Sequence, residues 1–174
     1  MVMGFKKILV AVDDPTKDEV VFNHGLSLAV PNQSHLRLVH CLSLDIYRNL
    51  GSMMDAGVGL HPQSKVLDAG EKEHLARTQA AKSWLETLRS QAVAQGIGAD
   101  FICETGDPGP LICYLATLWE AEVIVVGNSG KKGLRRLILG SVSQHVVDHS
   151  SCLTVVVPWD GSPPVEYPPG KTGG

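Results

Sequence analysis

The chain has 174 residues, which corresponds to one domain of ordinary size, and 44% of them are hydrophobic while 19% are charged. This composition excludes fibrous proteins and chains that stay disordered because they carry many charges and few apolar residues. The formal net charge of −3 argues against binding of nucleic acid or of an acidic membrane surface.

The first predicted unit is a strand, a turn and a helix. Residues 7–12 form a short apolar run that is typical of a strand buried on both faces. Asp13 and Asp14 end this run. Thr16 followed by Glu19 matches a capping box, and the apolar residues after it recur at helical spacing up to Asn32.

Residues 35–42 form the second predicted strand, and residues 43–64 follow it without a clear period. Long loops in compact domains are often functional, so we expect either a lid over a ligand or a partner-binding surface in this segment. From about residue 65 to 95 the pattern becomes helical with one apolar face, and Gly96 and Gly98 end it.

The second half of the chain repeats the alternation of strand and helix. Asp107 and Pro108 open a helix that we expect to be capped by the Asp107 carboxylate. In chain order the predicted elements are a strand at 99–104, this helix up to 119, a strand at 122–126, a helix at 142–150 and a strand at 153–157. The alternation predicts an α/β fold with a parallel sheet and helices on both faces.

The domain is expected to span residues 1–158. The last seventeen residues, 158–174, contain five prolines and four glycines, which excludes a helix or a central strand. We expect residues 159–174 to form an extended or disordered tail.

Cysteine spacing and hydropathy bear on chemistry and location. The four cysteines form no C-x-x-C pair and no run at zinc-ligand spacing, which predicts free thiols. No apolar stretch is long enough to span a bilayer, and the first residues lack the features of a signal peptide. We therefore expect a cytoplasmic protein.

Parallel sheets of this class bind ligands at the carboxyl ends of their strands. The loop after residues 122–126 contains Gly127 and Gly130, and a further glycine, Gly140, precedes Ser141 at the start of a helix. Glycines let backbone N–H groups approach a phosphate, and a helix N-terminus adds unpaired donors, so this arrangement suits an anion. The alternative is that the glycines only form a turn and a tight strand–helix contact.

The spacing of these residues, G-x2-G-x9-G-S, resembles the signature of the universal stress protein family, in its ATP-binding branch. The resemblance covers about residues 6–158 and includes the strand that ends at Asp13, the strand that ends at Cys41 and the final 153–157 strand. It implies a five-stranded parallel sheet of order 3-2-1-4-5, in a Rossmann-type three-layer sandwich of the adenine nucleotide alpha hydrolase kind.

The resemblance also implies roles for single residues. Asp13 is expected near the adenine or ribose of ATP, and the backbone of Cys41 faces the adenine. Gly127 and Gly130 line the ribose and phosphate path, where Asn128-Ser129 departs from the bulkier or basic pair common in the family. The residues expected to hold the phosphates, through N–H groups and the two serine hydroxyls, are Gly140, Ser141, Val142 and Ser143.

Three other groups of polar residues have competing interpretations. The four basic residues Lys131, Lys132, Arg135 and Arg136 are either a flap over a triphosphate or a solvated surface. His145 and His149 have metal-ligand spacing, but without a third ligand we expect surface residues there. His40 is expected to be a hydrogen-bonded core histidine.

The doublet Asp13-Asp14 also suggests a phospho-accepting receiver domain, but the lysine that ends the fifth strand of receivers is missing. The P-loop and dinucleotide motifs are absent as well, so binding is favoured over catalysis.

The resulting prediction is a universal stress protein that binds ATP, or ADP or AMP, with Mg²⁺ or Mn²⁺ accompanying the phosphates. We expect it to regulate a stress response through a signalling partner, with little or no hydrolysis. The valine-rich edge strand 153–157 invites pairing with another strand, and the resemblance implies that a second copy pairs there. A nucleotide-free interaction module of chaperone type and a weak ATPase remain the alternatives.

Overall fold

The computed structural model describes residues 4–43, 63–128 and 139–158. Strands and helices alternate along the described chain, as predicted. In chain order they are β1 (Lys7–Ala11), α1 (Glu19–Asn32), β2 (His35–Leu42), α3 (Gln63–Ala94), β3 (Ala99–Thr105), α4 (Pro108–Trp119), β4 (Val123–Asn128), α5 (Ser141–His149) and β5 (Leu153–Pro158).

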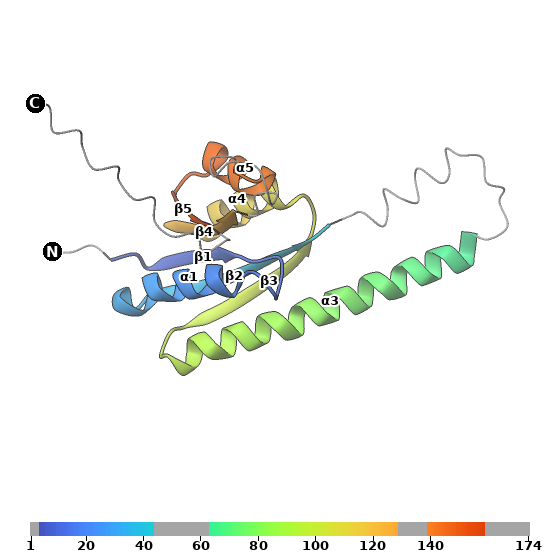
Figure 1. Ribbon diagram of the computed structural model, residues 1–174, viewed down its shortest axis with the longest axis horizontal. Coiled ribbons are helices and arrows are strands. Elements are labelled where there is room, and N and C mark those ends of the chain that lie inside the picture. Colours follow the sequence, from blue (N-terminus) through green and yellow to red (C-terminus); the bar gives the residue numbers. More distant parts are fainter. Residues whose placement is uncertain (1–3, 44–62, 129–138, 159–174) are drawn as a thin grey trace, which may run out of the picture.

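The strands form one parallel sheet of order β3-β2-β1-β4-β5, which confirms the predicted order (Figure 1). β1 lies in the centre, and its last residue, Ala11, is paired with Val39 on one side and Val126 on the other. The chain leaves β1 toward β2 and later returns to place β4 on the opposite side. Strand order therefore reverses at β1, the place where sheets of this kind bind ligands.

Helices cover both faces of the sheet (Figure 1). Alternate residues of a strand point to opposite faces, so the apolar β1 supplies both cores. Val10 packs with Phe22 of α1 and Leu85 of α3 on one face. On the other face Leu9 packs with Ile112 of α4 and Val146 of α5.

Two expected helix caps are wrong in detail. Thr16 does not cap α1, because its N–H and its hydroxyl both donate to Oδ1 of Asp14, and the helix begins after Asp18. Asp107 is the N-cap residue of α4, but its side chain makes no capping hydrogen bond. In both places a residue suited to capping is present without capping the helix through its side chain.

Several sequence predictions lie outside the described residues. They concern the segment 44–62, Gly130, the four basic residues between 131 and 136, and the tail 159–174. In the part of the chain that the structure describes, none of the helices is both long and apolar enough to cross a membrane.

Candidate functional site

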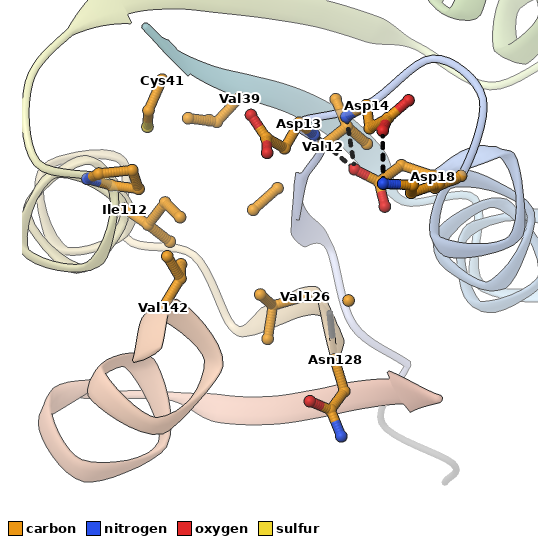
Figure 2. A pocket seen from close by; sticks show the side chains of 14 residues that line it. Val12, Asp13, Asp14, Asp18, Val39, Cys41, Ile112, Val126, Asn128 and Val142 are labelled. Carbon is orange, nitrogen blue, oxygen red and sulfur yellow. Dashed lines mark hydrogen bonds and ion pairs between the residues drawn. The ribbon is translucent and has the colours of Figure 1, made fainter. Parts of the chain in front are cut away.

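A cleft of about 140 Å³ opens at the carboxyl ends of β1, β2 and β4 (Figure 2). Its apolar walls come from strand ends and from the first turns of two helices. These walls include Val39 of β2, Val126 of β4, Ile112 of α4 and Val142 of α5. Branched aliphatic side chains on several sides suit a flat apolar group such as a nucleobase.

Cys41 lines the cleft two residues beyond the last β1–β2 pair. Successive residues of a strand direct their backbone groups to alternate sides. The carbonyl of Val39 accepts the N–H of Val12 on the β1 side, and the carbonyl of Leu42 accepts the N–H of Gly106 on the β3 side. Cys41 lies two residues after Val39, so its backbone N–H and C=O point to the same side as those of Val39, toward β1. At the level of Cys41, β1 has already ended.

Three aspartates surround the turn between β1 and α1. Oδ2 of Asp18 accepts the backbone N–H of Asp13 at 2.5 Å and that of Asp14 at 2.9 Å (Figure 2). Asp14 in turn forms an ion pair with Lys17, with 3.0 Å between Oδ2 and Nζ. These contacts fix the turn and leave the Asp13 carboxyl at the cleft.

The environment shifts the acidities of the cleft residues in different directions. Partial desolvation of the Asp13 carboxyl beside the cleft raises its pKa, and the nearby His40 partly opposes this rise. Hydrogen bonds from Thr16 lower the pKa of Asp14 to about 2. Burial raises the pKa of the Cys41 thiol to about 12, so this thiol stays protonated and is a poor nucleophile.

Gly127 lines the cleft at the end of β4 and has no room for a side chain. A Cβ atom there would lie 2.9 Å from Cγ2 of Val21 and 3.4 Å from Oδ1 of Asp18. The glycine therefore lets α1 and the β1–α1 turn approach β4 closely.

The first turn of α5 adds backbone donors beside the cleft. The N–H of its N-cap residue, Gly140, donates to Oδ1 of Asn128 at 3.0 Å, which ties the helix start to the end of β4. The first helical bond runs from the N–H of Gln144 to the carbonyl of Gly140. The N–H groups of residues 141–143 thus have no acceptor within α5, which is the usual condition of an anion site at a helix N-terminus.

Ser143 is buried, and its hydroxyl donates to the carbonyl of Gly140 at 3.0 Å. In this geometry its hydroxyl proton stabilises the first turn of α5. A direct hydroxyl contact from Ser143 to a phosphate stays a prediction.

The three histidines singled out from the sequence are resolved. His40 is buried and its Nδ1 atom lies 2.9 Å from the carbonyl of Val12, which confirms a hydrogen-bonded core histidine. The rings of His145 and His149 stack with their centroids 4.1 Å apart. Within the described parts of the chain, no group of three or more His, Cys, Asp or Glu side chains could hold a metal ion.

The structure brings several predicted residues together. Asp13, Cys41, Gly127 and Val142 line the cleft, and Gly140, Ser141 and Ser143 lie next to Val142 at the start of α5. The sequence analysis missed three kinds of contributor: the turn acceptor Asp18, the linking residue Asn128, and the apolar walls Val39, Ile112 and Val126. The sequence did contain a signal that singles out Asp18, because aspartate directly before a helix is a preferred N-cap residue.

Comparisons with known proteins agree with this geometry. The sequence profile described as the universal stress protein family matches residues 4–158. Universal stress protein Sll1388 of Synechocystis is 32% identical over 161 residues, covering 89% of this chain and 99% of the relative.

Two solved structures share the fold. The MJ0577 protein of Methanocaldococcus jannaschii superposes with a TM-score of 0.73 at 22% identity, covering 92% of this chain and all of that one. A universal stress protein family protein from Arabidopsis thaliana, solved with AMP bound, gives a TM-score of 0.56 at 18% identity, covering 90% of this chain and 93% of that one.

Proposed function

The chain belongs to the universal stress protein family, and we propose that it binds ATP in the cleft at the ends of β1, β2 and β4. Occupancy of the cleft by the nucleotide then acts as a stress-response signal to a protein partner. The observation that carries this proposal is the placement of the Cys41 backbone and the start of α5 at one cleft between aliphatic walls.

The adenine end of the cleft has both chemical features that a nucleobase needs. An adenine edge offers a ring-nitrogen acceptor next to an amino donor. The backbone N–H and C=O of Cys41 form the complementary pair, and Val39 and Ile112 supply apolar contact for the ring faces. The AMP-bound relative supports an adenine ligand.

The phosphate end is assigned to the N-terminus of α5. The N–H groups of Ser141, Val142 and Ser143, which have no acceptor within α5, and the positive end of the helix dipole favour a phosphate there. Mg²⁺ or Mn²⁺ would accompany the phosphates and offset their charge. On the family pattern, Gly130 is assigned to the path of the ribose and the phosphates.

We propose little or no hydrolysis. The Cys41 thiol is protonated at neutral pH because burial raises its pKa to about 12, so it does not act as a nucleophile. A weak ATPase is the alternative, and turnover that disappears in Asp13→Ala would support it.

The nucleotide proposal is tested by purifying the protein without added nucleotide, denaturing it and identifying the adenine compounds released. The same preparation is titrated with ATP, ADP, AMP and GTP in the presence of Mg²⁺. We expect released adenine nucleotide, and a stabilisation by ATP of about 2.7 kcal/mol when its concentration is 100 times Kd.

Gly140→Trp blocks the start of α5, and Gly98→Trp places the same side chain in the turn between α3 and β3, far along the chain from the cleft. Loss of nucleotide only in the folded Gly140→Trp protein supports the site. Neither released nucleotide nor stabilisation by ATP in the wild type would instead favour the nucleotide-free interaction module.

We further propose a cytoplasmic homodimer that pairs through β5. This strand is an edge of the sheet and its first residue, Leu153, is 59% exposed. Exposed apolar edges readily pair with another strand. Leu153→Lys should shift the molar mass measured by light scattering toward that of the monomer, whereas Leu118→Lys, at a leucine on α4 that is 69% exposed, should not.

A further inference from the structure

A second cavity, of about 440 Å³, lies on the α3 side of β2. It shares Asp13, Cys41 and Pro108 with the cleft described above, but its other walls are different. They come from Pro15, from the end of β2 and from one stripe of α3. The volume falls in the range of small-molecule sites, which is roughly 300–1,000 Å³.

The cavity exists because α3 is longer than the strands that it covers. α3 has 32 residues, or about 48 Å, while β2 has 8 residues, or about 26 Å. The C-terminal half of α3 packs on the sheet through residues such as Leu85 and Leu88. Its N-terminal half runs past the carboxyl ends of β2 and β3 (Figure 1). The middle of the helix, from His74 to Trp84, forms the outer wall of the cavity.

His40 presents a hydrogen-bond acceptor to this cavity. Its Nδ1 atom faces the carbonyl of Val12, and because a carbonyl only accepts, Nδ1 carries the proton. When the ring carries this single proton, Nε2 is an acceptor, and no described residue donates to it. No buried side-chain nitrogen or oxygen among the described residues lacks a partner, so Nε2 keeps some accessible surface although His40 as a whole is buried, and the cavity that His40 lines gives access to it.

A flat apolar surface lies next to this acceptor. The half-buried Trp84 of α3 lines the cavity, and its ring lies nearly perpendicular to that of His40, at 84° and with 5.9 Å between centroids. Ala80 and Ala81 on the same helix leave space beside the indole. These contacts hold both rings in place and favour a planar ligand.

The opposite end of the cavity is basic. His74 and Arg77 lie three residues apart, on one side of α3, and both line the cavity. Nε2 of His74 is 3.5 Å from Oγ1 of Thr105 at the end of β3. Arg77 forms no ion pair with a carboxylate in the described part of the chain. Among the described residues of the lining, Asp13 is the one carboxylate. It follows β1, so β2 separates it from the β3 end where His74 lies.

We infer that this cavity binds a small planar organic anion that also carries a hydrogen-bond donor. The anionic group pairs with Arg77 and His74, the planar body lies against Trp84, and the donor bonds to Nε2 of His40. This ligand is distinct from the nucleotide, although the shared wall at Asp13 and Cys41 lets the two sites influence each other. The inference does not require that the cleft binds ATP.

The test uses 4-hydroxybenzoate as the probe and follows the Trp84 indole N–H signal in assigned ¹H–¹⁵N spectra. Benzoate lacks the hydroxyl donor and 4-hydroxybenzamide lacks the charge, so the three compounds separate the two polar contacts. We expect saturable binding of 4-hydroxybenzoate, with each control compound about tenfold weaker or more, because charged and buried hydrogen bonds are lost.

Arg77→Gln removes the proposed cationic partner, and Arg89→Gln makes the same change on α3 at a residue that pairs with Glu86 instead. We expect affinity for the probe to fall about tenfold in Arg77→Gln only. Equal affinity in wild type and Arg77→Gln, or no shift of the Trp84 signal, would overturn the inference.

A competition arm separates this site from the nucleotide cleft. The probe should still shift the Trp84 signal when AMP is present in excess. Displacement of the probe by AMP would place it in the cleft and overturn a distinct site. If AMP itself does not bind, the proposed nucleotide function fails, while the probe titration and its variants still decide the second site.

Discussion

The side chain of Asp18 holds the backbone of Asp13 in place. Its Oδ2 atom accepts the Asp13 N–H at 2.5 Å and the Asp14 N–H at 2.9 Å, so the first residue before α1 fixes the turn that follows β1. Asp13 lies in this turn and lines the cleft. Asp18 is therefore a positioning residue for the candidate nucleotide site.

Removing the Asp18 carboxylate should lower both the stability of the protein and its affinity for the nucleotide. We expect Asp18→Ala to lower the free energy of unfolding by about 1 kcal/mol, because two N–H groups lose their partner. Nucleotide affinity should fall as well, since Asp13 is no longer held. Asp18→Asn keeps an oxygen acceptor and should retain most of both properties.

Urea denaturation and calorimetric titration measure these effects. Asp148→Ala is the control, because this exposed carboxylate on α5 accepts hydrogen bonds only from Gln144 in the described structure. An Asp18→Ala protein with wild-type stability and affinity would show that the turn forms without this contact.

Asp13 should make the folded protein less stable as its carboxyl ionises. Partial desolvation raises its pKa above the ordinary value of 3.8, so the folded state binds the proton more tightly than the unfolded state. The resulting stabilisation is complete below pH 3.8 and is lost as the pH rises through the folded-state pKa. The stability of Asp13→Asn relative to wild type should therefore increase between pH 3.5 and pH 7, as followed by urea denaturation. A relative decrease over this range would contradict the raised pKa.

Asp14 should show the opposite dependence, although it is the next residue. Hydrogen bonds from Thr16 lower its pKa from 3.8 to about 2, so its contribution is present above pH 3.8 and is lost as the pH falls toward 2. Asp14→Asn should destabilise the protein at pH 7, and the difference from wild type should shrink at low pH. Thr16→Val removes the hydroxyl donor and should follow the same trend; a difference that does not depend on pH would argue against this cause.

The thiol of Cys41 should be dispensable for nucleotide binding. The proposed contacts to adenine come from its backbone, which a substitution at this position preserves. We expect Cys41→Val to keep nucleotide affinity within about threefold of wild type, a difference below 1 kcal/mol. Calorimetric titration with ATP and AMP measures this. A loss of more than tenfold would mean that the sulfur atom itself contacts the ligand.

Much of the fold could be predicted because its signals are local. The apolar runs of β1 and β4 contain too few residues for helices and are apolar on both faces, as strands covered on two sides must be. Their alternation with amphipathic helices indicated a parallel sheet, and residues at strand ends, such as Asp13 and Cys41, became site candidates for that reason.

The capping box predicted for the first helix was wrong because neighbouring polar groups at the start of α1 compete for hydrogen-bond partners. Thr16 fits a capping box by spacing, but Asp14 takes its hydroxyl hydrogen bond, and Asp18 turns its carboxylate back toward β1 instead of capping α1. Such choices depend on small differences between alternative hydrogen bonds. Spacing in the sequence does not resolve them.

The sequence by itself determined the strand and helix order, the family signature and the residues at the strand ends, because periodicity and short motifs depend only on neighbours in the chain. Only the tertiary structure decided which residues face each other across the cleft and which ring nitrogen of His40 faces the carbonyl of Val12. It also decided that α3 extends past β2 and forms one wall of a second cavity. These features depend on the register between strands and on the packing of helices far apart in sequence, for which local patterns carry no information.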